Sequence, residues 1–324
     1  MKIETFIEHW PLAKTFRISR EARDTAKVIR VQLKSRSMMG QGECVPQTRY
    51  GESLESVQQQ IHDIASQLRD DLLPDSLQNM LPAGAARNAV DCALWDLLAK
   101  KNKKRIWELL GITLNRCYTA YTLSIDTPEN MAREAKTERG RPLLKLKLDG
   151  EQVLERVQAV RAANDTARLI VDANEAWTAD FLVNILPDLK KLSVELVEQP
   201  LPAADDAVLG KIEHVLPLGA DESCHLSNDL EKLATRYDVI NIKLDKTGGL
   251  TEALRLKARA QRMGFRIMIG CMVGTSLAMA PAWLLAHDTE FVDLDGPLLL
   301  ARDREHGMKY SLKNINPPVP LLWG

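Results

Sequence analysis

The chain of 324 residues lacks several features that would place it in a specialised class of protein. It has no apolar run of about 18 residues, the length that a transmembrane helix requires. Its net charge is only −1, so it lacks the electrostatic signature of a protein that binds nucleic acid or an anionic membrane. The amino-terminal segment carries charges within its apolar alternation and does not resemble a signal peptide. We expect a soluble protein that binds neither nucleic acid nor membrane.

Cysteines are few and scattered. There are five, an odd number, and no two of them form a Cys-x-x-Cys pair. This usage suits a reducing cytosol and argues against a zinc site or a disulfide framework. We therefore expect a cytoplasmic protein, and the sequence is compatible with a homo-oligomer. The cysteines are Cys44, Cys92, Cys117, Cys224 and Cys271.

What the sequence does contain is a regular series of strand-like segments, and the most informative one runs from Leu143 to Gly150. In it, leucines alternate with Lys145, Lys147 and Asp149, and a period of two is typical of a strand with two different faces. By itself this pattern also fits a half-exposed strand whose lysines point into water.

Each of the next four strand-like segments carries a charged residue at or near its end. Counted from Lys147, the successive steps to Asp172, Glu198, Asp221 and Lys243 are about 25, 26, 23 and 22 residues. Each step accommodates one strand, one helix and two loops of a βα barrel. Because the carboxyl ends of all barrel strands meet at one face, these side chains are expected to line one pocket.

Three of these residues are carboxylates, which repel one another at the end of an apolar barrel unless a cation neutralises them. Ligands that are all oxygens favour a hard cation, Mg²⁺ before Mn²⁺ or Ca²⁺. We therefore predict that Asp172, Glu198 and Asp221 bind one Mg²⁺. The alternative is that they only cap strand ends.

The first part of the chain has a different pattern. Strands are expected near 2–10, 27–34 and 38–44, followed by a helix that Ser53 caps and a second helix near 83–101. Two polar loops, 16–23 and 47–52, are expected between these elements. This predicts an α+β domain in front of the barrel.

We assign residues 1–112 to this domain, hereafter the cap, and residues 113–297 to the barrel. The tail, 298–324, is expected to return to the cap. Strand one of the barrel is expected at 118–125, strand seven at 265–270 and strand eight at 291–295.

At the level of motifs, the chain resembles the enolase superfamily, in its muconate-lactonizing-enzyme subgroup. The resemblance rests on Lys145-x-Lys147, Asp172-Ala-Asn174-x-x-Trp177, Glu198-Gln-Pro200, Ala-Asp221-Glu222-Ser223 and Asn-Ile-Lys243-Leu-Asp-Lys-Thr-Gly-Gly249. It covers nearly the whole chain and implies an α/β fold, a modified TIM barrel of the (β/α)7β type with an α+β capping domain.

Within the subgroup, Asp293-Leu-Asp295 is similar to the Asp-x-Asp motif of dipeptide epimerases. The Trp-Pro-Leu start and the Arg-Tyr-Gly-Glu-Ser loop are most similar to bacterial L-Ala-D/L-Glu epimerases, which act on murein-derived dipeptides. The resemblance implies that Asp293 and Asp295 bind the α-ammonium group of a dipeptide. It also implies that an arginine of the first loop holds the glutamate side chain. Arg23 matches that place best, and Arg20 is the substitute.

The same resemblance implies a reaction in which a proton leaves one face of the α-carbon and returns on the other. Lys147 and Lys243 would be the two acid/bases, with Lys145 aiding the substrate carboxylate electrostatically. A lysine acts as a base only when neutral, and Mg²⁺ and Lys145 are both expected to lower its pKa. Thr122 is expected to face the substrate. Asn174 either supports the metal ligands or has only a structural role in packing.

Three alternatives remain at this point. An o-succinylbenzoate synthase or N-acylamino acid racemase would keep the site, but its substrate has no free ammonium to pair with Asp293 and Asp295. A binding protein without catalysis would not need all five charged positions. A Schiff-base aldolase would not need the metal triad. Strand seven holds no histidine, which disfavours a His–Asp base.

Overall fold

The computed structural model describes residues 1–324, and its first part is an antiparallel sheet packed on helices. The three strands lie in chain order, and α2 packs against β3. Gly40 and Gly42 of β3 permit this approach, because a Cβ at either position would collide with the α2 backbone. The elements are β1 (Lys2–Arg17), β2 (Ala22–Ser35), β3 (Met38–Cys44), α1 (Leu54–Asp63), α2 (Ala85–Asn102) and α3 (Ile106–Leu110).

The expected capping of α1 is confirmed, since the Ser53 side chain accepts a hydrogen bond from the backbone N–H of Ser56 at 3.0 Å. The expected loop at 16–23 is present but was predicted too long at both ends. β1 and β2 continue their pairing to Arg17 and Ala22, and only residues 18–21 turn. Polar residues are compatible with an exposed strand, so they do not by themselves end the pairing of Phe16 with Arg23 and of Arg17 with Ala22.

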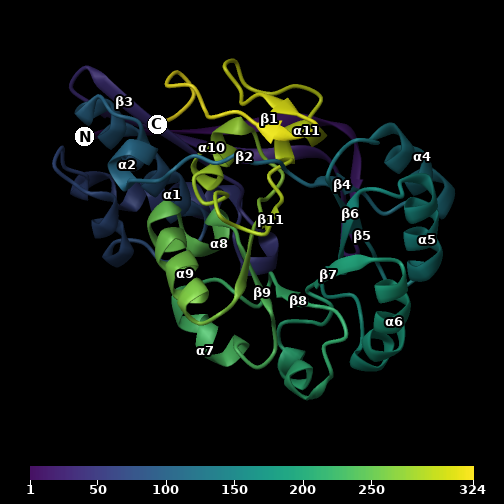
Figure 1. Cartoon of the computed structure of the whole chain (residues 1–324). Coiled ribbons are helices and arrows are strands. Elements are labelled where there is room, and N and C mark those ends of the chain that lie inside the picture. The colour runs from purple at the N-terminus through teal and green to yellow at the C-terminus, as the bar shows by residue number, and fades with distance from the viewer.

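Eight parallel strands follow and lie side by side in chain order, as Figure 1 shows for the teal and green part of the chain. The Ala120 backbone N–H donates to Val292 O at 2.7 Å and links the two ends of this sheet. The expected barrel with an α+β domain before it is confirmed. The strands are β4 (Tyr121–Leu123), β5 (Leu143–Lys147), β6 (Arg168–Asp172), β7 (Val194–Glu198), β8 (Leu218–Ala220), β9 (Val239–Ile242), β10 (Arg266–Ile269) and β11 (Phe291–Val292).

Helices cover the outside of this sheet, and between β7 and β8 only a 3-10 turn at Asp206–Lys211 is present. None of the helices is both long and apolar enough to span a membrane. The helices are α4 (Pro128–Thr137), α5 (Val153–Ala163), α6 (Ala179–Lys191), α7 (Leu230–Leu233), α8 (Leu244–Thr247), α9 (Leu250–Arg262) and α10 (Ser276–Trp283).

The inward faces of the strands form two layers of different chemistry. The lower layer is a cluster of apolar side chains, and it includes Leu143, Ile170, Leu196, Val239 and Phe291. Two or four residues further along the same strands, the inward positions are charged or polar. The alternation predicted for β5 therefore continues around the barrel and places the polar layer at the carboxyl ends.

After α11 (Gly296–Leu299) the chain returns to the amino-terminal sheet. Figure 1 shows this yellow segment beside β1, where Leu300 bridges to Leu12. At the end of the chain, Trp323 Nε1 donates to Cys92 O at 2.9 Å, which fastens the tail on α2. The tail includes the short strands β12 (Tyr310–Ser311) and β13 (Asn314–Ile315).

Candidate active site

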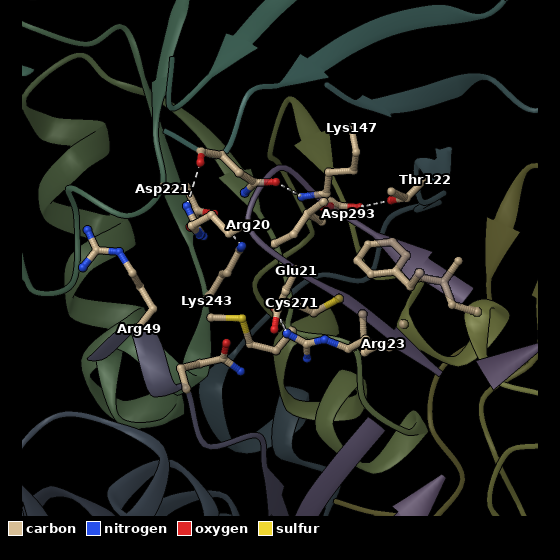
Figure 2. Close-up of a pocket in the computed structure, with 18 of the residues that line it drawn as sticks. Arg20, Glu21, Arg23, Arg49, Thr122, Lys147, Asp221, Lys243, Cys271 and Asp293 are labelled. Atoms are coloured by element: carbon tan, nitrogen blue, oxygen red, sulfur yellow. Dashed lines mark hydrogen bonds and ion pairs between the residues drawn. The ribbon is translucent and has the colours of Figure 1, made fainter. Parts of the chain in front are cut away.

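The carboxyl ends of the barrel strands open into a cavity of about 350 Å³ that the cap partly covers. Its barrel wall includes both lysines of β5, the residue after β9 and the acids after β11. The cap contributes residues from the β1–β2 turn and from the 3-10 turn at Thr48–Tyr50. Figure 2 shows Arg20, Arg23 and Arg49 of the cap and Lys147 and Asp293 of the barrel around this space, with the Arg49 guanidinium group pointing away from the other labelled residues.

The three predicted metal ligands come together. Asp172, Glu198 and Asp221 each offer a carboxylate oxygen, and these oxygens all lie within 4.8 Å of one another. All three residues are buried. Glu198 Oε1 accepts a hydrogen bond from Asn241 at 2.7 Å, and Glu198 Oε2 makes no hydrogen bond of good geometry but lies 2.7 Å from Lys145 Nζ.

This donor set could hold a metal ion. Three buried carboxylates this close together repel one another unless positive charge faces them, and a divalent cation would add to the charge that the lysines supply. Only oxygen atoms converge there, which is the set that a hard divalent cation prefers.

The three predicted lysines all contact the triad. Lys145 Nζ lies 2.7 Å from Glu198 and 3.1 Å from Asp172. Lys147 Nζ lies 2.5 Å from Asp172, and Lys243 Nζ lies 2.6 Å from Asp221. Because β5 and β9 are four strands apart in the sheet, Lys147 and Lys243 approach the triad from opposite sides.

These contacts distribute charge unevenly among the carboxylates. Burial alone would raise the pKa of Asp172, but Lys147 and Lys145 outweigh it and lower that pKa to about 2. For Glu198, burial and the charge of Asp172 outweigh Lys145 and raise the pKa to about 7. Glu198 is therefore the member of the triad with the weakest compensation from the protein itself.

The expected lowering of a lysine pKa is not what the protein alone produces. Burial and Lys145 both lower the pKa of Lys243, yet the charges of Asp221, Glu198 and Glu222 together outweigh them and the net direction is upward. The reason is the direct ion pair between Lys243 and Asp221.

At the end of β11, the two acids have different partners. Asp293 Oδ2 accepts a hydrogen bond from Lys145 at 2.8 Å, and its other oxygen lies 3.5 Å from Thr122 Oγ1. Asp295 accepts only from the Thr122 backbone N–H, at 2.6 Å. Burial and the charge of Asp293 raise the pKa of Asp295 to about 7. The structure thus brings Thr122 and both acids to one wall of the cavity.

The two candidate arginines of the cap differ in their partners. The Arg20 guanidinium donates to Asn174 O at 2.7 Å, to Glu175 at 2.9 Å and to Glu222 at 2.8 Å. Arg23 also lines the cavity and pairs with Glu21 in the same turn. Arg20 is held by the barrel, whereas Arg23 is held only by its own hairpin.

Several residues that touch the site were missed by the sequence reasoning. Lys246 is fully buried and its Nζ lies 2.7 Å from Asp221 Oδ1. Asn241 lies two residues before Lys243 on the same face of its segment, a spacing that could have identified it. Glu175 and Arg49 form an ion pair across the cavity mouth, and nothing in the local sequence links them.

Comparison with known families accounts for both parts of the chain. Residues 1–111 match the mandelate racemase/muconate lactonizing enzyme N-terminal domain, and residues 129–299 match the enolase C-terminal domain-like family. The chain therefore belongs to the mandelate racemase/muconate lactonizing enzyme family, with an enolase-like catalytic domain.

Individual relatives are similar over almost their full length. The chain is 48% identical to the L-Ala-D/L-Glu epimerase of Escherichia coli (strain K12), over 97% of this chain and 99% of that protein. It is 47% identical to an N-acetyl-D-glutamate racemase of Pseudoalteromonas sp, over 92% and 95%.

Two solved structures extend this comparison. An enolase family member from Agrobacterium tumefaciens with homology to dipeptide epimerases, with bound sodium and L-Ala-L-Glu, has a TM-score of 0.97 and 49% identity, over 99% of both chains. A dipeptide epimerase from Enterococcus faecalis V583, complexed with Mg and L-Leu-L-Tyr, has a TM-score of 0.91 and 29% identity, over 99% and 98%.

Proposed function

We propose that this protein is a dipeptide epimerase that interconverts L-Ala-L-Glu and L-Ala-D-Glu. The observation that carries the proposal is the position of Lys147 and Lys243 on opposite sides of the carboxylate triad. Such a pair can remove a proton from one face of a carbon atom and return one on the other face. The relatives named as epimerases support this reading.

The chemistry needs strong electrostatic help, because the α-proton beside a carboxylate is only weakly acidic. We propose that Asp172, Glu198 and Asp221 hold one Mg²⁺, which when bound would neutralise the substrate carboxylate and the negative charge that grows as the proton leaves. Lys145, fully buried beside the triad, adds a fixed positive charge to the same region.

The remaining cavity residues orient the dipeptide. Asp295, together with Asp293, accepts the α-ammonium group, which needs charged acceptors in a partly dry pocket. Thr122 holds Asp295 through its backbone N–H. Arg23 takes the glutamate side chain, because its partner Glu21 is local and can be displaced. Arg20 does not fill this role, since three barrel groups already accept from it.

We also propose a cytoplasmic role in recycling murein peptides, in which free L-Ala-Glu arises from the breakdown of cell-wall peptides. The five unpaired cysteines are compatible with a reducing compartment.

A second candidate has one observation in its favour, the relative named as an N-acetyl-D-glutamate racemase. An N-acylamino acid racemase would use the same triad and lysines on a substrate without an ammonium group. The substrate of an o-succinylbenzoate synthase also lacks an ammonium group. Both would leave Asp293 and Asp295 without a cationic partner from the substrate.

The test is α-proton exchange in D₂O with Mg²⁺ present, followed by mass spectrometry or proton NMR. The substrates are L-Ala-L-Glu, N-acetyl-L-Ala-L-Glu and N-acetyl-D-glutamate. We expect rapid exchange at the glutamate α-carbon of the free dipeptide and far slower exchange in both acetylated compounds. Faster exchange in N-acetyl-D-glutamate would replace the epimerase by the racemase.

A further inference from the structure

One carboxylate of the barrel rim ties two separate segments of the cap to the barrel. Arg49 donates to both oxygens of Glu175, at 2.9 and 2.8 Å, and Arg20 donates to Glu175 Oε2 at 2.9 Å. The Ala203 backbone N–H also donates to it, at 2.8 Å. The Glu175 side chain is only 7% exposed, so these are not ordinary surface ion pairs. Figure 2 shows the two arginines, Arg20 and Arg49, beside the cavity.

The backbone at this carboxylate has an uncommon conformation. Asn174 and Glu175 are consecutive non-glycine residues with positive φ, 43° and 69°. Such a conformation is unfavourable and persists only when surrounding contacts enforce it. Two contacts come from the barrel: Asn174 N–H donates to Asp172 Oδ1, and Glu175 N–H donates to Gln199 O, both at 2.9 Å. The cap arginines supply the others, through the Glu175 side chain.

The side chain of Asn174 leads from this strained turn to one of the two lysines. Lys147 Nζ donates to Asn174 Oδ1 at 3.1 Å, and Asn174 Nδ2 donates to Glu222 Oε1 at 3.3 Å. Arg20 donates to the same Glu222 oxygen at 2.8 Å. A continuous set of hydrogen bonds therefore joins the cap to Lys147.

The other lysine has no such connection. Lys243 Nζ donates to Asp221, a residue of the barrel, and makes no hydrogen bond to Asn174, Glu222 or the cap arginines. The Nζ atoms of the two lysines are thus held differently: Lys147 Nζ bonds a residue that the cap also contacts, whereas Lys243 Nζ bonds only a barrel carboxylate. The cap does hydrogen-bond Asp245, two residues after Lys243, but not the Lys243 side chain.

We propose that Glu175 is a positioning residue that makes the placement of Lys147, and not of Lys243, depend on the seating of the cap. The inference rests on the proposed two-lysine epimerase. It adds that Lys147 can transfer a proton at its face of the substrate α-carbon only when Arg20 and Arg49 are bound to Glu175. The face served by Lys243 is competent without them.

The comparison must be made one face at a time. The equilibrium constant sets the ratio of kcat/KM for the two directions of epimerisation, so no variant of the complete enzyme can change that ratio. We therefore place Glu175→Gln in two backgrounds, Lys243→Ala, which leaves only Lys147, and Lys147→Ala, which leaves only Lys243. Glutamine keeps the length of the side chain and the acceptor for the Ala203 N–H but loses the charge that binds the arginines.

The measurement is the rate of α-proton exchange of L-Ala-L-Glu and L-Ala-D-Glu in D₂O at saturating Mg²⁺. We expect Glu175→Gln to lower Lys147-dependent exchange by about ten-fold, in the range that misplacement of a catalytic group costs. Lys243-dependent exchange should change by less than about two-fold. Arg49→Gln should give the same asymmetric pattern, which a general loss of stability would not.

A matched control is Glu195→Gln. Glu195 also pairs with an arginine, accepting from Arg168 Nε and Nη2 at 2.7 to 3.1 Å, but it lies near the start of β7, at the far end of the strand from Glu198. Loss of this pair should leave both exchange rates unchanged. Melting temperatures of all variants identify any that fail to fold, and Arg49→Gln keeps the test decisive if Glu175→Gln is one of them.

Two results would overturn the inference. Equal losses on both faces, or no loss on either, would show that Glu175 does not act through Lys147. If the wild-type enzyme is active but neither single-lysine variant exchanges the α-proton, the premise that each lysine acts as an independent base is wrong. Absence of exchange by the wild-type enzyme on any free dipeptide would instead refute the proposed function itself.

Discussion

Asp293 and Asp295 look equivalent in the sequence, but their surroundings differ. Asp293 is occupied by Lys145, whereas Asp295 accepts only one backbone N–H. A second positive charge would therefore stabilise Asp295 more than Asp293. The pKa of Asp295 is raised to about 7 by burial and by the charge of Asp293. A bound ammonium group would favour the ionised form of this acid.

We expect Asp295→Asn to lower kcat/KM for L-Ala-L-Glu by roughly 10- to 150-fold, since a charged hydrogen bond contributes about 1.5–3 kcal/mol. Asp293→Asn should also lower it. Mg²⁺ affinity, measured by calorimetry, should stay within about three-fold in both variants, because neither residue is a proposed ligand. Unchanged kcat/KM in Asp295→Asn would argue against this acid as the ammonium acceptor.

The two proposed bases make a separate prediction. Replacing either Lys147 or Lys243 with alanine should lower epimerisation by at least about 100-fold, the usual contribution of a general acid or base. Each variant should still exchange the α-proton of one isomer in D₂O. Chiral chromatography measures epimerisation, and mass spectrometry measures exchange. Two-way epimerisation that persists in Lys243→Ala would exclude the two-base scheme.

At the scale of the elements, three neighbouring strands combine to make the proposed metal site. The inward positions of β6 and β7 end in Asp172 and Glu198, which are paired across the sheet, and Asp221 directly follows β8. Each strand contributes one ligand, so no single element binds the ion alone.

Removal of the metal should therefore abolish catalysis and loosen three strand ends together. We expect EDTA to eliminate activity and Mg²⁺ to restore it. Mg²⁺ at about 100 times its dissociation constant should also stabilise the fold by about 2.7 kcal/mol, visible as a higher melting temperature. The control is Asp221→Asn, whose melting temperature should respond less to Mg²⁺. Full turnover in a rigorously metal-free sample would contradict the assignment.

At the scale of the whole molecule, buried carboxyl groups join the cap to the barrel. Asp245 of α8 accepts from the Val45 N–H and from Asn88, both in the cap, at 2.9 and 2.8 Å. Burial raises the pKa of Asp245 to about 7, and it does the same for Asp91, which accepts from Thr251. No cation pairs directly with either carboxyl.

This arrangement makes stability depend on pH in a defined direction. Because the pKa of Asp245 is higher in the folded state than the usual 3.8, its contribution is fully present below about pH 4 and is lost as the pH rises through 7. The loss is at most about 4 kcal/mol. We expect Asp245→Asn to reduce the decrease in unfolding free energy between pH 5 and 8. Urea unfolding measures it, with the exposed Asp71→Asn as control. An unchanged pH profile would contradict a raised pKa.

The sequence alone determined the barrel and the set of charged residues at its mouth. The alternation of Lys145 and Lys147 and the spacing from Asp172 to Lys243 are local consequences of strand period and βα length, so they can be read along the chain. The ends of these segments were less certain, as the hairpin at 16–23 shows, because charged and polar residues are common to loops and to exposed strands.

Only the tertiary structure decided how the cap meets the site. Arg20 and Glu222 are 202 positions apart and Arg49 and Glu175 are 126 apart, and no local pattern couples residues at such separations. The different partners of Arg20 and Arg23, the contacts of the cap arginines with Glu175 and the hydrogen bond from Lys147 to Asn174 all depend on the packing of the cap against the barrel. Contacts of this kind are set by shape and charge complementarity in three dimensions, which the order of residues does not display.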